Sequence, residues 1–156
     1  VGANIVAVAG FAPVHGAQDQ AVMRLVDGKA AQNHDDPDNS MWFDKHKLEG
    51  KDKDTDRGRL LIDLKAAVEV SRVSTYSWHR GDRARQNYVL YGRNGAGDAG
   101  AKDLAAAGWQ RIASVDSNSL GDGDKHVASV AKKGGLGTYT HLLMDVKRRR
   151  LGVTRP

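Results

Sequence analysis

A glycine-rich stretch in the second half of the sequence has the spacing of a nucleotide-binding loop. Residues 95–100 read Gly-Ala-Gly-Asp-Ala-Gly, which matches the GxGxxG pattern of dinucleotide-binding proteins. There the glycines let the backbone approach a pyrophosphate at the start of a helix. The candidate helix that follows here, Ala101–Ala107, is only about two turns long. We interpret the stretch as a flexible insertion, and an NAD-binding enzyme remains the minor alternative.

Carboxylates with regular spacing indicate a second chemistry, the binding of a hard cation. Asp52, Asp54 and Asp56 occupy alternate positions, and a further acid, Asp63, follows eleven residues after the first. This spacing is similar to that of an EF-hand calcium loop. The sixth position of such a loop is a glycine, and here it is Arg57. We expect a solvated charged turn, with a calcium loop of another type as the alternative.

Several kinds of active site are excluded by residue type. The chain has no cysteine, which excludes a disulfide scaffold, a Cys-ligated zinc site and a cysteine nucleophile. Its six histidines lack the HExxH spacing of a zinc protease, and no GxSxG nucleophile motif occurs. We therefore expect this chain not to be an enzyme.

Length and charge are those of one globular domain. The chain has 156 residues, with 24 Lys and Arg against 19 Asp and Glu, a net charge of +5. No apolar run approaches the roughly 20 residues that span a membrane. The basic residues are interspersed with acids, so we expect no nucleic-acid partner. The first residue is Val1, which we interpret as the start of an excised module. We expect one module over residues 1–147 and a basic tail over 148–156.

The apolar segments are short, bounded by turns and often alternating, which is typical of β-strands. In residues 139–144, Tyr139, His141 and Leu143 should face one way and the intervening residues the other. Seven or eight such strands predict an all-β fold, an antiparallel β-sandwich or jelly roll with one or two short helices at Asp19–Val26 and Ala101–Ala107. The predicted strands lie in Asn4–Ala9, Arg59–Leu64, Val68–Trp78, Tyr88–Gly92, Trp109–Val115, His126–Ala131 and Thr138–Val146.

The order of several short motifs is informative. They are Leu25–Gly28, Ser40–Phe43, Leu60–Lys65, Val70–His79, Arg83–Gly92, Gly108–Val115 and Tyr139–Val146. This order resembles the discoidin, or F5/8 type C, family of galactose-binding-like β-sandwiches. Many members are carbohydrate-binding modules attached to bacterial glycan-degrading enzymes. The resemblance covers roughly residues 22–147.

The resemblance implies a core and a metal site. Inward residues of the strands would form the core, with Trp109 packing after a tight turn at Gly108. Family members often hold a structural Ca²⁺ near an Asp-Gly turn, which corresponds here to Asp27. Asp36 and Asp38 lie in the acidic run that would complete its ligands. The inward residues are Leu61, Val73, Leu90, Ile112 and Leu142.

The resemblance also implies carbohydrate-binding residues in loops at one end of the sandwich. Sugar C–H faces pack on aromatic rings, and sugar hydroxyls need oriented hydrogen bonds. The loop from Trp78 to Arg85 falls where the family carries an arginine and an Asn-Gly-Arg-like element, although no such element occurs here. Trp42 corresponds to a family position that is usually in the core. The candidate carbohydrate-binding residues are Trp42, His46, Trp78, His79, Arg80, Arg83, Arg85 and Asn87.

Several of these residues are cationic, which favours an anionic glycan because arginine matches the geometry of carboxylate and sulfate. The sequence therefore predicts a non-catalytic carbohydrate-binding module that targets a larger secreted, periplasmic or surface protein to polysaccharide. We expect the module to be covalently linked to other domains and not to insert into membranes. The alternative is a discoidin-like domain for protein–protein contact or structural spacing.

Overall fold

A computed structural model describes residues 4–7, 25, 33–34, 57–95, 104–105 and 108–147. No helix in this part of the chain has the length and apolar character that a membrane crossing requires. The described strands are β1 (Asn4–Ala7), β2 (Arg57–Val70), β3 (Arg72–His79), β4 (Asn87–Arg93), β5 (Gln110–Asp116), β6 (Asp124–Ala131) and β7 (Gly137–Lys147).

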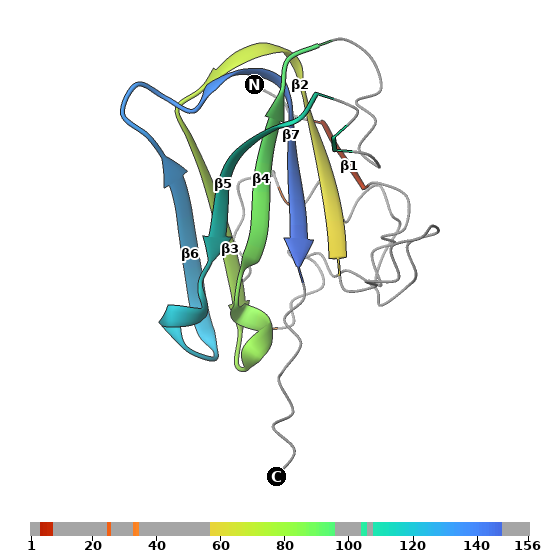
Figure 1. Ribbon diagram of the computed structural model, residues 1–156. Coiled ribbons are helices and arrows are strands. Elements are labelled where there is room, and N and C mark those ends of the chain that lie inside the picture. Colours follow the sequence, from red (N-terminus) through yellow and green to blue (C-terminus); the bar gives the residue numbers. More distant parts are fainter. Residues whose placement is uncertain are drawn as a thin grey trace.

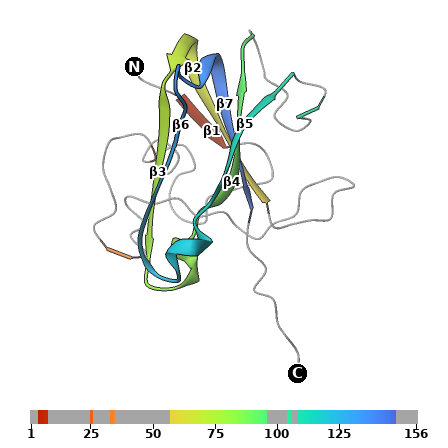
Figure 2. The same cartoon turned by 60° about the vertical axis from the view of Figure 1, so that its left-hand side comes forward.

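The strands form two antiparallel sheets that pack as a sandwich. One sheet has five strands in the order β1-β2-β7-β4-β5, and the other pairs β3 with β6. Figure 1 shows the strands other than β1 running roughly along one axis, and Figure 2 shows β3 and β6 as a layer beside the larger sheet, at its left. This arrangement confirms the predicted all-β sandwich.

Strand β2 differs from its prediction in length and in where it ends. The sequence suggested a break between Leu64 and Val68, but the strand continues to Val70. Its pairing with β7 shifts between Asp63 and Val68, and Lys65 has a φ of 68°. The segment that interrupts the alternating pattern is therefore a bulge within one strand. The chain leaves the five-stranded sheet after Val70 and enters the two-stranded sheet at β3.

The main core lies between the two sheets. Leu90 is completely buried and Leu142 is 4% exposed, as predicted for inward residues. Val73 and Ile112 are half-buried and pack against this core. Leu61 packs elsewhere, because its strand neighbours Leu60 and Ile62 point into the main core and alternation sends it to the opposite face.

A second, smaller core covers the outer face of the five-stranded sheet. It consists of buried Trp109 and Leu143, with Leu61, Tyr91 and Leu104 packed against them. Trp109 thus has the packing role expected of it, and the preceding Gly108 has the positive φ of a tight turn, 70°.

Tyr139 does not follow the predicted alternation. It belongs to the main core, whereas Leu143 belongs to the second core. The pairing of β2 with β7 shifts register in this part of β7, between His141 and Tyr139. The ring of Tyr139 then lies against Gly92, where an added Cβ would come within 2.5 Å of Tyr139 Cε1.

Several predicted elements lie outside the described residues. The tail over 148–156 and most of the glycine-rich stretch 95–100 are among them, as are the acids at positions 52, 54 and 56. Of the two predicted helices, only Leu25 and residues 104–105 are described, as a 3₁₀ residue and a turn. The helical segments described in the structure are the 3₁₀ turns η2 (Asp82–Ala84) and η3 (Asn118–Leu120).

Candidate functional site

The turn between β3 and β4 forms one end of the sandwich. It contains η2, closed by a hydrogen bond of 3.1 Å from the Ala84 N–H to the Gly81 carbonyl. The Gly81 N–H donates to Nδ1 of His79 at 2.8 Å, so the imidazole fixes the start of the turn. Figure 1 shows this turn beside η3, at the end of the sandwich opposite the β2–β3 connection. Polar side chains of the turn are thus presented together at one edge of the molecule.

A second loop, between β5 and β6, holds the first in place. The Gly123 N–H donates to the same Gly81 carbonyl at 3.1 Å. Gly123 has a φ of 81°, and a Cβ at this position would collide with the carbonyl oxygen of Arg80. Only glycine fits at position 123, because the backbone has a positive φ and because the two loops leave no room for a Cβ.

A buried glutamine anchors these loops to the strands. Gln86 is 8% exposed, and the two hydrogens of its Nε2 are shared among three acceptors: the carbonyls of Thr75 and His126, at 3.2 and 3.0 Å, and Ser77 Oγ at 3.1 Å. Thr75 Oγ1 in turn donates to Gln86 Oε1, and lies 3.0 Å from the hydroxyl of Tyr88. Burial raises the pKa of the Tyr88 phenol, which keeps it protonated as the donor to Thr75.

A buried histidine completes this network from the side of β6. His126 is 2% exposed; its Nδ1 lies 2.8 Å from Ser117 Oγ and its Nε2 lies 3.1 Å from the Gly123 carbonyl. Because a carbonyl only accepts, Nε2 carries the proton and Nδ1 accepts from Ser117. Ser117 Oγ accepts from the Gln86 N–H at 2.8 Å. Every group in this chain of hydrogen bonds has a defined role, which makes the end of the sandwich rigid.

The structure brings four of the predicted carbohydrate-binding residues together in the first turn. Arg80 and Arg83 are exposed, and Arg83 Nη2 lies 2.6 Å from Nε2 of His79. The ring of His79 also meets the ring of His34 edge-on, with centroids 6.0 Å apart. Two exposed cations, Arg80 and Arg83, thus belong to the same turn as His79, whose two ring nitrogens contact the Gly81 N–H and the Arg83 guanidinium.

Arg85, the fourth, is directed at the second loop. Its guanidinium forms an ion pair with Asp122, and its Nε donates to the Gly121 carbonyl at 3.3 Å. Its side chain is 13% exposed, whereas that of Asp122 is 60% exposed. In this arrangement Arg85 links the two loops, and Asp122 offsets its charge.

Trp78 and Asn87 lie beside the turn. Trp78 is half-buried near the end of β3, and the ammonium of Lys125 is 4.6 Å from the centroid of its ring. Lys125 pairs with Trp78 across the β3–β6 ribbon. Asn87 begins β4, half-buried, opposite Asp116 of β5.

The remaining predicted site residues, Trp42, His46, Asp27, Asp36 and Asp38, lie outside the described residues. Within the described part, no group of three His, Asp or Glu side chains is placed to hold a metal ion. The predicted calcium site therefore stays a prediction.

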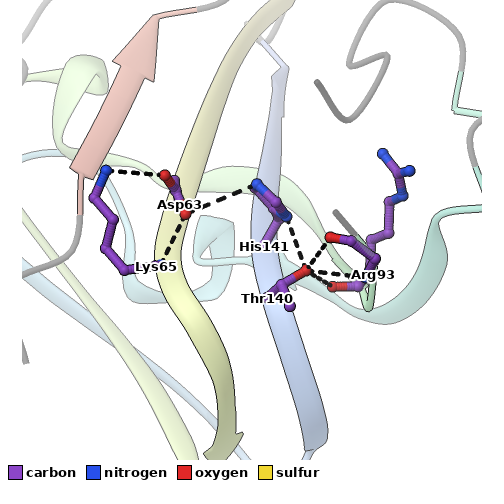
Figure 3. A network of polar contacts seen from close by, with 6 residues as sticks. Asp63, Lys65, Arg93, Thr140 and His141 are labelled. Atoms are coloured by element: carbon purple, nitrogen blue, oxygen red, sulfur yellow. Dashed lines mark hydrogen bonds and ion pairs between the residues drawn. The ribbon is translucent and has the colours of Figure 1, made fainter. Parts of the chain in front are cut away.

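A second polar network lies towards the other end of the five-stranded sheet (Figure 3). The Asp63 carboxylate accepts from the backbone N–H of Lys65 at 2.8 Å and from its ammonium at 3.0 Å. These hydrogen bonds, together with the charges of Lys65 and His141, lower the pKa of Asp63. His141 Nε2 is 3.8 Å from Asp63 Oδ1. The contacts brace the bulge of β2 against β7.

The same network reaches the segment after β4. Thr140 Oγ1 lies 2.9 Å from His141 Nδ1 and accepts from the Gly95 N–H at 3.1 Å. The same oxygen is 2.8 Å from the Gly95 carbonyl and 3.2 Å from that of Arg93. These contacts fix the chain as it leaves the sheet, and we assign this network a structural role.

Sequence reasoning missed the residues that build the frame of the site. Gln86, Ser117 and His126 have no motif, because their partners are largely backbone atoms or distant in sequence. A weaker signal was present in Gly121-Asp122-Gly123, which is typical of a turn between two strands. That signal predicts the second loop but not its contact with the first.

Comparison with known proteins identifies the fold. No protein-family model and no curated protein matches the sequence. The structure is similar to CpGH89CBM32-6 of Clostridium perfringens, with a TM-score of 0.52 and 14% identity over 95% of this chain and 85% of that chain. It is also similar to CpGH89CBM32-5 of the same organism, in complex with GalNAc-β-1,3-galactose, with a TM-score of 0.52 and 14% identity over 96% and 87% of the two chains.

A larger protein contains the same fold as one part. A Ruminococcus gnavus GH29 fucosidase in complex with fucose aligns with 95% of this chain but with only 22% of its own, with a TM-score of 0.51 and 16% identity. The similarity to all three proteins lies in the fold. The sandwich described above is therefore the fold of the CBM32 carbohydrate-binding modules.

Proposed function

We propose that this chain is a non-catalytic carbohydrate-binding module, whose ligand binds at the end of the sandwich formed by the β3–β4 and β5–β6 loops. The observation that carries the proposal is the pair of exposed cations Arg80 and Arg83 beside His79, in a turn held on a rigid frame of buried hydrogen bonds. Oriented donors on a rigid support are what recognition of sugar hydroxyls requires. The fold shared with CBM32 modules, one of them in complex with a disaccharide, supports this proposal.

The exposed cations of the β3–β4 turn favour an acidic sugar. Arg80 and Arg83 are exposed, and Arg83 also contacts Nε2 of His79 through its Nη2, at 2.6 Å. The planar guanidinium matches the geometry of a carboxylate or sulfate. We therefore propose a uronic or sulfated glycan as the preferred ligand.

The context of the module is part of the same proposal. The names of the CBM32 neighbours include that of a glycoside hydrolase family, GH89. In the fucosidase, the part that aligns with this chain is 22% of a longer protein. We propose that this chain is likewise linked to other domains of a secreted, periplasmic or surface protein. A structural Ca²⁺ held by Asp27, Asp36 and Asp38 is included in the proposal on the family resemblance.

A glycan array with calcium present, spanning neutral galactosides and acidic polysaccharides, tests this function. We expect binding to an acidic glycan that weakens between low and moderate salt, because exposed charges are screened. Arg83→Gln should weaken binding, whereas Arg111→Gln, an exposed arginine of β5, should leave it unchanged. A folded protein that binds no glycan would refute the proposal. A stable complex with a protein partner would then favour the interaction-domain alternative.

A further inference from the structure

The outer face of the β3–β6 ribbon carries exposed side chains that the fold does not use. Along β3, Val73 contacts the core and Thr75 and Ser77 join the buried network, so the alternate residues point outward. Tyr76 is one of these and is 68% exposed. Its partner across the ribbon, Val127, is 54% exposed. An exposed aromatic residue beside an exposed aliphatic one is typical of a contact surface.

The chemistry of this face is aromatic and cationic. Tyr76 and Trp78 lie two positions apart on one strand, so their Cα atoms are about 6.6 Å apart on the same face. Lys125 lies over the ring of Trp78 at 4.6 Å, and exposed Arg72 stands at the other end of the face. Outward positions 72–78 of β3 and 125–131 of β6 include no acid. The loop end differs, because Asp122 there offsets Arg85.

The face ends beside the proposed binding site. Trp78 and Lys125 form the second-last pair of the ribbon, and the last pair, His79 and Asp124, leads into the two loops. Between Arg72 and Tyr76, Ser74 Oγ lies 2.8 Å from Ser129 Oγ, which adds hydroxyl groups to the surface. A ligand held at the loop end could therefore extend along the strands, where the face offers rings, hydroxyls and cations.

We infer that the outer face of the β3–β6 ribbon is a second contact surface, which binds the continuation of an acidic polysaccharide chain held at the loop end. This inference rests on the proposed function and deepens it, because it makes the ligand a chain of several sugars rather than one terminal sugar. The exposed ring of Tyr76 packs against the C–H face of a sugar. Arg72 and Lys125 pair with their carboxylates or sulfates. Charge complementarity and continuity with the loop end favour this occupant over a single-stranded nucleic acid, which is bound in a basic groove.

The test compares acidic oligosaccharides of two lengths, a disaccharide and an octasaccharide of one sulfated or uronic glycan, by isothermal titration calorimetry. We expect the octasaccharide to bind more tightly. Tyr76→Ala should weaken octasaccharide binding by about 3–10-fold, the value of one aromatic contact, and leave disaccharide binding unchanged. Tyr76→Phe keeps the ring and should retain the affinity. Chemical shifts of residues 72–78 and 125–131 should change only with the octasaccharide.

The controls separate this inference from the proposed function. Arg83→Gln should weaken both lengths, whereas Arg72→Gln should weaken only the longer one, and Arg111→Gln neither. Equal affinity for the two lengths, or an unaffected Tyr76→Ala, would overturn the ribbon surface while leaving the loop-end site intact. Binding of neither glycan overturns both. Tighter binding of single-stranded DNA, abolished by Tyr76→Ala, would overturn the glycan and assign the face to nucleic acid.

Discussion

Replacing Gln86 by leucine tests whether the polar network, rather than apolar packing, holds the loop end together. The two N–H groups of the amide donate to carbonyls and a hydroxyl, and its oxygen accepts from Thr75, which is the equivalent of three hydrogen bonds. Each is worth about 0.5–1.5 kcal/mol net, so their loss costs roughly 1.5–4.5 kcal/mol. The hydroxyls of Thr75 and Ser77 keep partners in Tyr88 and the Ala84 carbonyl. We therefore expect a loss near the lower end, about 2–3 kcal/mol.

Urea unfolding followed by tryptophan fluorescence measures the loss in the free energy of unfolding. In thermal unfolding, at roughly 2–4 °C per kcal/mol for a chain of this size, the Tm should fall by about 4–12 °C. Gln110→Leu is the matched control, since Gln110 is exposed on β5. It should change stability by less than about 0.5 kcal/mol. A loss at Gln86 no larger than that of the control would refute the reasoning and leave the apolar core as the support of the loops.

Three further predictions concern packing, pH and calcium. Gly92→Ala should destabilise the protein by about 1–3 kcal/mol in thermal unfolding, because the new Cβ meets the Tyr139 ring; an unchanged Tm would contradict the packing. The lowered pKa of Asp63 means that its stabilisation is present above the ordinary value of 3.8 and is lost as pH falls through the folded pKa. Asp63→Asn should therefore cost roughly 0.2–1 kcal/mol in urea unfolding at pH 6, and the difference from wild type should narrow towards pH 3; a constant difference would exclude this linkage. Chelation of calcium should lower the Tm of the wild type but not of Asp27→Asn, and a wild type insensitive to chelator would argue against the calcium site.

The strands were predictable because their signal is local. The alternation of Val73, Thr75 and Ser77 indicates a strand with one inward face, and this signal does not depend on distant parts of the sequence. The structure has strand β3 over these residues. The length of β2 was not predictable in the same way. A bulge preserves hydrogen bonding while it breaks the alternation, so the sequence around Lys65 has the appearance of a loop.

The site was predictable only in part, for a related reason. His79, Arg80 and Arg83 lie within five residues of sequence, and one short turn holds them. The pairing of Arg85 with Asp122 joins loops that are far apart in the chain, and no local pattern encodes it. Residue type thus identified the cations, whereas the charge that offsets Arg85 became visible only with the contact between the loops.

The frame of the loop end has a consequence for how binding specificity can change. The bonds that shape the two loops come from main-chain atoms of Gly81 and Gly123 and from side chains behind them, such as Gln86 and His126. Arg80 belongs to the same turn and is exposed. Substitutions of such an exposed residue cost little folding free energy. If this end binds a glycan as proposed, its specificity can change without loss of the frame, which suits it to diversification in natural lineages and in libraries of engineered lectins.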